Sequence, residues 1–224
     1  MKEVKKENEQ KQAKYLFDEY IEMWLESQKQ YLKESTYYGY SRIIKKHIIP
    51  YFKPLKIELN ELKVTDIQKY YGYLLEVGLN PNSIKRHHAN IRKALQDAVN
   101  NDIILYNVAD RARLPNAKKY HANIYNGEQL QELIRVVKGT AIESAVMLTV
   151  YFDLRRGEVC GLKWENVDFE NNIIHIKNTR IAAREEIFQE STKNESSTRT
   201  LPMNEEIYTY LRKLKEQQKE DAKL

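Results

Sequence analysis

The chain has 224 residues, of which 42% are hydrophobic and 31% are charged, and its net charge is +5. A mean hydropathy of −0.71, with no apolar run near the roughly 18 residues of a membrane span, argues against a helical membrane protein. The single cysteine, Cys160, excludes an internal disulfide and a zinc cluster built on several cysteines. It also fits a reducing compartment, and the N-terminus lacks the apolar middle of a secretory signal, so we expect a soluble, cytoplasmic protein.

The basic excess lies entirely in the first half of the chain. Residues 1–119 contain 22 Lys and Arg against 15 Asp and Glu, whereas residues 120–224 contain 15 against 17. Such an asymmetry is typical of a nucleic-acid-binding module joined to a second domain. Sixteen tyrosines and only seven glycines indicate a mainly helical chain.

Residues 1–14 are predicted to be a charged tail, and residues 15–110 a bundle of helices. Apolar residues recur there at three- and four-residue spacing. The helices are expected to begin near Tyr15, Ser35–Thr36, Thr65–Asp66 and Asn82–Ser83, with stops at Pro50 and Gly78. A short apolar element follows at 103–108, and residues 111–125 are predicted to be a linker.

Two of these helices carry basic and polar residues opposite their apolar stripes. The residues are Thr36, Tyr38, Arg42, Lys45 and Lys46 on the second helix and Lys85, Arg86, His87, Asn90 and Lys93 on the fourth. The basic side chains could follow a DNA backbone, while Thr36, His87 or Asn90 could reach base edges. An ordinary solvated, lysine-rich face is the alternative. Adjacent histidines at 87 and 88 point about 100° apart on a helix, so we expect no metal site there.

The second half is predicted to mix helices and strands. Asn126 can cap one helix, and an apolar helix over 141–152 leads into the stretch VYFDLRRGEVCGLKW, which contains Arg155. Three strands are predicted at 173–176, 179–188 and 197–203, with residues 192–196 as the hairpin between the second and the third. A final helix is expected from Glu205 to about residue 219.

Apolar residues on both sides of Arg155 are expected to hold it on a rigid frame. A guanidinium in such a place needs an anion, because an unpaired buried charge costs several kcal/mol. Glu158 lies three residues further on and could form an internal ion pair. A phosphate would fit the planar fork of donors equally well. The local sequence leaves both interpretations open.

The string DLRRGEVCGLKWENVDFENNIIHI resembles the first active-site box of the tyrosine recombinase (phage integrase) family, and TKNESSTRTLPM resembles its β-hairpin lysine segment. The segments STYYGYSRIIKKHIIPYF and NPNSIKRHHANIRKALQDAV are similar to the family's core-type DNA-binding domain. The resemblance covers roughly residues 15–215. It implies a mainly α, α+β chain: a basic helical core-binding bundle at 15–110, a linker at 111–125, and at 126–224 part of a mixed α/β catalytic domain with a small three-stranded antiparallel sheet.

The resemblance also implies an activity, which is site-specific DNA recombination and integration of the kind that phages and other mobile elements use. DNA is cleaved and rejoined through a 3′-phosphotyrosyl intermediate, with no metal, cofactor or small-molecule substrate. The implied partners are double-stranded DNA with a core recombination site and other recombinase protomers. Arg155 matches the arginine that holds the scissile phosphate, Glu158 the acidic residue that supports the site, and Lys193 the hairpin lysine that protonates the leaving 5′-oxygen.

The sequence departs from the family pattern in two ways. Asp153 stands where the family usually has glycine, so we expect a poorer fit to a positive φ and a possible ion pair with Arg155. No His-x-x-Arg motif occurs in the sequence, and Tyr208 and Tyr210 follow Lys193 too closely to match the nucleophile.

We therefore expect a fragment without the C-terminal half of the catalytic domain, which binds core-site DNA and is inactive in cleavage by itself. One alternative is a non-catalytic DNA-binding regulator derived from the integrase fold. Another is an unrelated helical protein in which Arg155 and Glu158 form only a structural pair.

Overall fold

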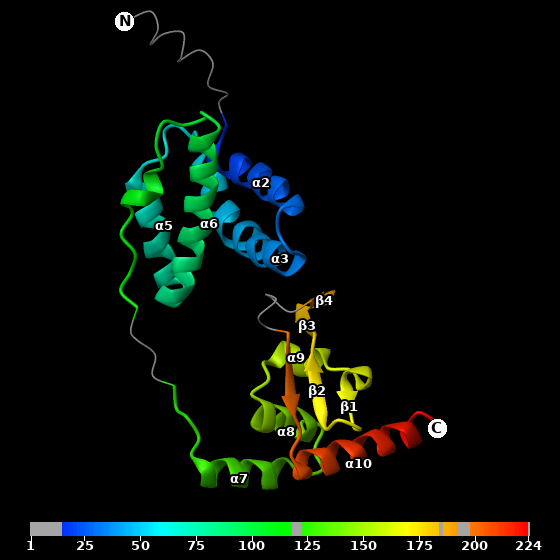
Figure 1. The fold of residues 1–224 in the computed structure, drawn as a ribbon. Helices are drawn as coiled ribbons and strands as arrows, with labels where there is room; N and C mark the ends of the chain where they lie inside the picture. The colour runs from blue at the N-terminus through cyan, green and yellow to red at the C-terminus, as the bar shows by residue number, and fades with distance from the viewer. Residues whose placement is uncertain (1–14, 118–121, 184–185, 192–197, 224) are drawn as a thin grey trace, which may run out of the picture. The chain divides into compact units, whose positions relative to one another are not determined.

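The structure is a computed structural model that describes residues 15–117, 122–183, 186–191 and 198–223 (Figure 1). It divides into unit 1, residues 1–121, and unit 2, residues 122–224. The division falls within the stretch 111–125 that the sequence predicts as a linker. No helix within the described ranges combines the length and the apolarity that crossing a bilayer requires.

Unit 1 is a bundle of helices. Its elements are α2 (Phe17–Ser27), η1 (Gln28–Gln30), α3 (Glu34–Ile43), the π-helix η2 (Ile44–Ile48), α4 (Ile49–Phe52), η3 (Lys53–Leu55), α5 (Val64–Glu76), α6 (Pro81–Asn100) and η4 (Val108–Arg111). Gly78, with a φ of 85°, follows the end of α5 as predicted. The left-handed conformation there suits glycine because it has no Cβ.

Several helix boundaries in unit 1 differ from the predictions; α5, for example, begins at Val64 rather than at Thr65–Asp66. The second helix begins at Glu34 rather than at a Ser35–Thr36 cap. It also continues past Pro50, which lies in the first turn of α4, where a missing N–H is tolerated. The fourth helix begins at Pro81, because the side chain of Asn80 is the N-cap and accepts a hydrogen bond from the N–H of Asn82 at 2.8 Å.

The core of unit 1 forms where the apolar stripes of these helices meet. Phe17 of α2 packs edge-on against Phe52 of α4, with ring centroids 4.7 Å apart, and Phe52 contacts Tyr70 of α5 at 5.3 Å. All three side chains are at most 1% exposed. Burial of this apolar area is the main contribution to the stability of the bundle.

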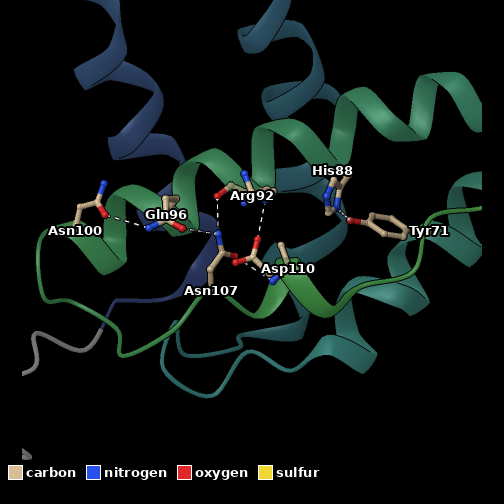
Figure 2. Close-up of polar contacts among 8 residues, drawn as sticks. Tyr71, His88, Arg92, Gln96, Asn100, Asn107 and Asp110 are labelled. Atoms are coloured by element: carbon tan, nitrogen blue, oxygen red, sulfur yellow. Dashed lines mark hydrogen bonds and ion pairs between the residues drawn. The ribbon is translucent and has the colours of Figure 1, made fainter.

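Polar contacts bind the last part of unit 1 along α6 (Figure 2). The side chain of Asn107 donates to the carbonyl of Arg92 at 2.9 Å, and Nε of Arg92 donates to Asp110 at 2.7 Å. One turn nearer the start of α6, the hydroxyl of Tyr71 and Nδ1 of His88 are 2.7 Å apart, which connects α5 with α6. The predicted apolar element at 103–108 forms neither a helix nor a strand before Val108, where η4 begins, although Ile104 is buried.

Unit 2 combines helices with short strands, and the predicted fold class is confirmed. Its helices are α7 (Gly127–Val137), α8 (Glu143–Phe152), α9 (Arg156–Gly161), η5 (Trp164–Asn166) and α10 (Glu205–Asp221). Its strands are β1 (Val167–Asp168), β2 (Ile173–Ile176), β3 (Asn178–Ala183), β4 (Glu186–Ser191) and β5 (Arg199–Pro202). Asn126 caps α7 as predicted, accepting from the N–H of Gln129 at 2.9 Å.

The antiparallel sheet has three strands in the order β1-β2-β5, and a separate hairpin pairs β3 with β4. The predicted single strand at 179–188 is therefore wrong, because its residues belong to two strands, β3 and β4, that pair with each other. The predicted hairpin between the second and third strands is also wrong, since β4 pairs with β3 whereas β5 pairs with β2. Alternation along a strand shows which face is buried, not which neighbour it pairs with. Lys193, expected in that hairpin, lies outside the described residues.

The frame of unit 2 holds the segment between α8 and α9 in place. Leu154 belongs to the core cluster that includes Phe152 and Ile174. Gly161, at the end of α9, lies directly against β3. A Cβ at this position would be 2.7 Å from the carbonyl oxygen of Asn178, so only glycine allows this close packing.

Candidate phosphate-binding site and DNA interface

Arg155 occupies the junction between two helices of unit 2. It is the N-cap residue of α9, and α8 ends three residues before it at Phe152. Leu154, its neighbour, is 3% exposed, whereas the side chain of Arg155 is 75% exposed. The backbone is therefore anchored in the core while the guanidinium faces solvent.

Glu158 is the buried carboxylate of the site, with a side chain only 1% exposed. Its Oε2 accepts a hydrogen bond from the backbone N–H of Arg155 at 3.0 Å, and its Oε1 accepts one from Nη1 of the same residue at 3.0 Å. The internal ion pair that the sequence left open is thus present.

Arg199, the first residue of β5, holds the same carboxylate from the other side. Its Nη1 donates to Oε1 of Glu158 and its Nη2 donates to Oε2, each at 3.0 Å. Two parallel bonds of this kind are the strongest common form of an arginine–carboxylate contact. The segment TKNESSTRTLPM contains Arg199, but no residue near it in the sequence indicates that Glu158 is its partner. The contact requires β5 to pair with β2, and sequence reasoning did not assign that pairing.

These contacts determine the charge of the site. The hydrogen bonds from Arg199, and then those from Arg155, lower the pKa of the Glu158 carboxyl to about 2, against the opposing effect of burial. Glu158 is therefore ionised at neutral pH. One carboxylate faces two guanidinium groups, so the cluster of Arg155, Glu158 and Arg199 keeps a net charge of +1.

Most of the hydrogen-bonding capacity of Arg155 remains available to an anion. A guanidinium has five N–H donors. Within the described residues, the side chain of Arg155 makes one ion pair, through Nη1 to Glu158. The ion pair and the phosphate interpretation of Arg155 are therefore compatible rather than exclusive.

Asp153 adopts the left-handed conformation that glycine would favour, with φ 51° and ψ 41°. The expected ion pair between Asp153 and Arg155 is wrong for the described contacts, because Arg155 pairs with Glu158 instead. The charge of Asp153 acts on a different arginine. Hydrogen bonding to Glu158, and more weakly the charge of Asp153, raises the pKa of Arg199.

Replacing Asp153 with glycine is expected to stabilise unit 2 by about 0.5–1 kcal/mol, because glycine adopts a positive φ without strain. The change also removes a negative charge from the C-terminal end of α8, where it is unfavourable. Asp153→Asn is the matched control, since it removes the charge and keeps a side chain. Urea unfolding of both variants measures the two contributions. A Gly variant no more stable than the Asn variant would show that the backbone is not strained.

The predicted DNA-contact residues of unit 1 differ in exposure. Thr36, Arg42, Lys45, Lys46, Lys85 and Arg86 are exposed, and Tyr38 and Lys93 are half-buried. His87 and Asn90 are 3% and 4% exposed, so their placement on an exposed face is wrong. The reason is that α6 packs against both α5 and η2, which buries a wider arc than one stripe.

Both buried residues make polar contacts within the bundle, although Oδ1 of Asn90 is buried with no hydrogen-bond partner among the described residues. Nδ1 of His87 lies 2.8 Å from the hydroxyl of Tyr70 on α5, and its ring lies 5.2 Å from that of His47 on η2. The side chain of Asn90 donates to the carbonyl of Arg86 within α6 at 2.8 Å. Neither residue is in a position to reach a base edge in this conformation.

The basic segments of unit 1, α3 with η2 and α6, contact each other through individual side chains. Nζ of Lys93 on α6 is 5.5 Å from the ring centroid of Tyr40 on α3. The rings of His47 on η2 and His87 on α6 form a second contact, with centroids 5.2 Å apart. After burial, the positive charges of Arg42 and Lys46 are the next causes that lower the pKa of His47. Lys45 pairs with Glu26 at 3.0 Å, but an exposed pair contributes at most about 1 kcal/mol.

Comparison with known families matches both units. Residues 16–75 match the model described as "Phage integrase, N-terminal SAM-like domain", and residues 124–223 match the model described as "Phage integrase family".

Two curated proteins are similar over most of the chain. The ICEBs1 integrase of Bacillus subtilis (strain 168) is 26% identical over 224 residues, covering 98% of this chain and 60% of that protein. A protein described as "Tyrosine recombinase XerC-like", from Caldanaerobacter subterraneus, is 23% identical over 208 residues, covering 85% of this chain and 48% of its own length. The chain thus spans about half to three-fifths of these relatives.

Solved structures share the fold. The Tn1549 transposon integrase in complex with a circular intermediate DNA aligns with a TM-score of 0.78 at 18% identity, covering 91% of this chain and 66% of that one. A lambda integrase dimer bound to a COC′ core site aligns with a TM-score of 0.66 at 13% identity, covering 85% and 49%.

Proposed function

Because this chain belongs to the phage integrase, or tyrosine recombinase, family, we propose that it binds the core recombination site of a mobile element and holds a scissile phosphate there. The DNA-bound integrases with the same fold support double-stranded DNA as the partner, and the lambda integrase dimer supports further protomers. We also propose that the protein is cytoplasmic, which fits a DNA partner and the single cysteine.

The cluster of Arg155, Glu158 and Arg199 is the observation that carries this proposal. Attack on a phosphodiester builds negative charge on its non-bridging oxygens. A fixed guanidinium opposes that charge without having to reorganise during the reaction. Arg155 has the required properties, because its backbone is anchored by buried Leu154 and its guanidinium is exposed.

Lys193 would complete this half of the chemistry by donating a proton to the leaving 5′-oxygen. The sequence contains no His-x-x-Arg motif, and no tyrosine in it matches the family's nucleophile. We therefore propose that this chain alone binds DNA without cleaving it. A covalent protein–DNA adduct on a nicked trap duplex would contradict that proposal.

In unit 1, we propose that side chains of α3, η2 and α6 contact the phosphates of the DNA backbone. The contacts would come from the exposed members of the predicted set: Thr36, Arg42, Lys45, Lys46, Lys85 and Arg86. Tyr38 and Lys93, which are half-buried, would lie at the edge of this surface. Contacts of this type position a protein on the duplex more than they read its sequence.

Binding of the full chain to duplex DNA is expected to weaken steeply as salt rises, because each neutralised phosphate contributes a slope of about −0.9 in log K against log salt. The triple variant Arg42→Ala, Lys46→Ala, Arg86→Ala should lower that slope by up to about 3. Fluorescence anisotropy with a labelled duplex at several salt concentrations measures it.

The matched control is the triple variant Lys53→Ala, Lys63→Ala, Lys69→Ala. It removes the same charge from exposed positions of unit 1 that are not in the predicted set. It should change the slope little. Equal losses in both triple variants would show that diffuse charge, not this surface, binds the DNA.

A further inference from the structure

We propose that Arg199 is a positioning residue, which takes up the charge of Glu158 and thereby leaves Arg155 free to bind a phosphate. The inference rests on the proposed function for the nature of the anion. It adds a role for a residue on β5 that does not itself have to touch the DNA.

The two arginines donate different numbers of side-chain hydrogen bonds to Glu158. Arg199 bonds to both carboxylate oxygens through two nitrogens, and its side chain is 28% exposed. Arg155 bonds through one side-chain nitrogen and its backbone N–H, and its side chain is 75% exposed. The buried carboxylate is therefore matched mainly by the more buried guanidinium.

This division leaves the excess positive charge on Arg155. Without Arg199, a single carboxylate would face a single guanidinium, and the pair of Arg155 and Glu158 would have no net charge. Glu158 could then also form a two-pronged pair with Arg155, the geometry that a guanidinium fork favours. An incoming phosphate would have to compete with that pair.

The sheet gives Arg199 a fixed place from which to act. Arg199 is paired with Ile176 across the β2–β5 ladder, and Ile176 is 1% exposed in the core of unit 2. Glu158 lies on α9, which is separated from β5 by more than thirty residues of sequence. The Arg199–Glu158 contact thus joins the sheet to the turn that presents Arg155.

The test follows the N–H resonance of Nε of Arg155 in the full chain as inorganic phosphate is added, with the resonance assigned from an Arg155→Lys variant. Arg199→Gln should weaken phosphate binding about tenfold, which corresponds to roughly 1.4 kcal/mol. The double variant Arg199→Gln, Glu158→Gln has the net charge of the wild type. It should recover binding to within about threefold of the wild type.

Arg199→Lys separates charge from geometry, because it retains the charge and lacks the fork. It should bind phosphate with an affinity between those of the wild type and Arg199→Gln. A merely structural role for Arg199 predicts no recovery in the double variant. Amide resonances of the β2–β5 ladder report whether each variant is folded.

Wild-type affinity in a folded Arg199→Gln variant, or no recovery in a folded double variant, would overturn the inference. So would a wild-type Arg155 resonance that does not respond to phosphate. The proposed function is judged separately, by the salt dependence of duplex binding. If duplex binding depends steeply on salt and the Arg42, Lys46 and Arg86 triple variant lowers that slope, any of these results would contradict only the role of Arg199.

Discussion

Glu158→Ala is expected to destabilise unit 2 by roughly 3 kcal/mol, because it removes the charged hydrogen bonds that the buried carboxylate accepts from two guanidinium groups. The wild-type carboxylate accepts bonds from Arg155 and from Arg199 while only 1% exposed. Urea unfolding monitored by fluorescence of Trp164 measures the loss, in a Trp24→Phe background so that unit 2 alone is observed.

Glu165→Ala is the matched control for this prediction. Glu165 is an exposed carboxylate of the same unit that lies 3.6 Å from Lys163. Its removal should change stability by less than about 0.5 kcal/mol. Equal effects of the two substitutions would show that the Glu158 cluster does not stabilise the fold.

The ionisation of Glu158 is expected to make the stability of unit 2 depend on pH in acid. The pKa of Glu158 is lowered in the folded protein to about 2 from an ordinary value of 4.5. Its contribution is therefore complete above pH 4.5, falls as the pH decreases toward 2, and amounts to roughly 3 kcal/mol. Glu158→Gln should flatten the stability curve in that window, and an unchanged curve would contradict the assignment.

Unit 1 is expected to lose stability at a higher pH, between about 6.5 and 4, because His87 is buried in its neutral form. Burial, and then the neighbouring His47, lowers the pKa of His87 from 6.5 to about 4. The unfolded chain takes up a proton below pH 6.5, whereas the folded chain does not until pH 4. The loss is therefore roughly 3 kcal/mol by pH 4, with no further loss from this group below it.

Other groups around His87 act in the same direction or do not titrate in this range. The hydroxyl of Tyr70 faces Nδ1, and burial raises the pKa of that tyrosine far above neutrality. Burial also lowers the pKa values of His47 and His88. These two histidines therefore add to the slope, so the total loss should be at least that of His87.

Trp24, which is 4% exposed in unit 1, reports this unfolding in a Trp164→Phe background. His87→Gln keeps a polar group near Tyr70 and removes the titration, so the loss between pH 6.5 and 4 should shrink. His175→Gln, on β2 of unit 2, is the control and should leave the slope of unit 1 unchanged. A slope that His87→Gln does not reduce would contradict the assignment.

The elements that the sequence predicted well depend on residues a few positions apart. The Asn126 cap of α7, the end of α5 before Gly78 and the start of α10 at Glu205 all follow from local side-chain and backbone preferences. The same holds for the candidate pair of Arg155 and Glu158, which are one helical turn apart. Lys193 remains a prediction from its resemblance to the family segment.

The buried faces of the unit 1 helices depend on contacts between helices that are distant in sequence. His87 and Asn90 are polar residues on a basic helix, and their polarity led to the prediction of an exposed face, although His87 lies at helical spacing from Ile84 and Ile91. They are buried because α6 has packing partners on two sides, α5 through Tyr70 and η2 through His47. The number of neighbours around a helix is a property of the assembled bundle.

By itself, the sequence determined the helical bundle, the mixed second unit, the basic asymmetry and the apolar helix that ends just before Arg155. The tertiary structure alone decided that β5 pairs with β2, and hence that Arg199 meets Glu158. The physical reason is the range of the interactions. Helix periodicity and capping act over three or four residues, whereas strand pairing and buried ion pairs join residues that only the folded chain brings together.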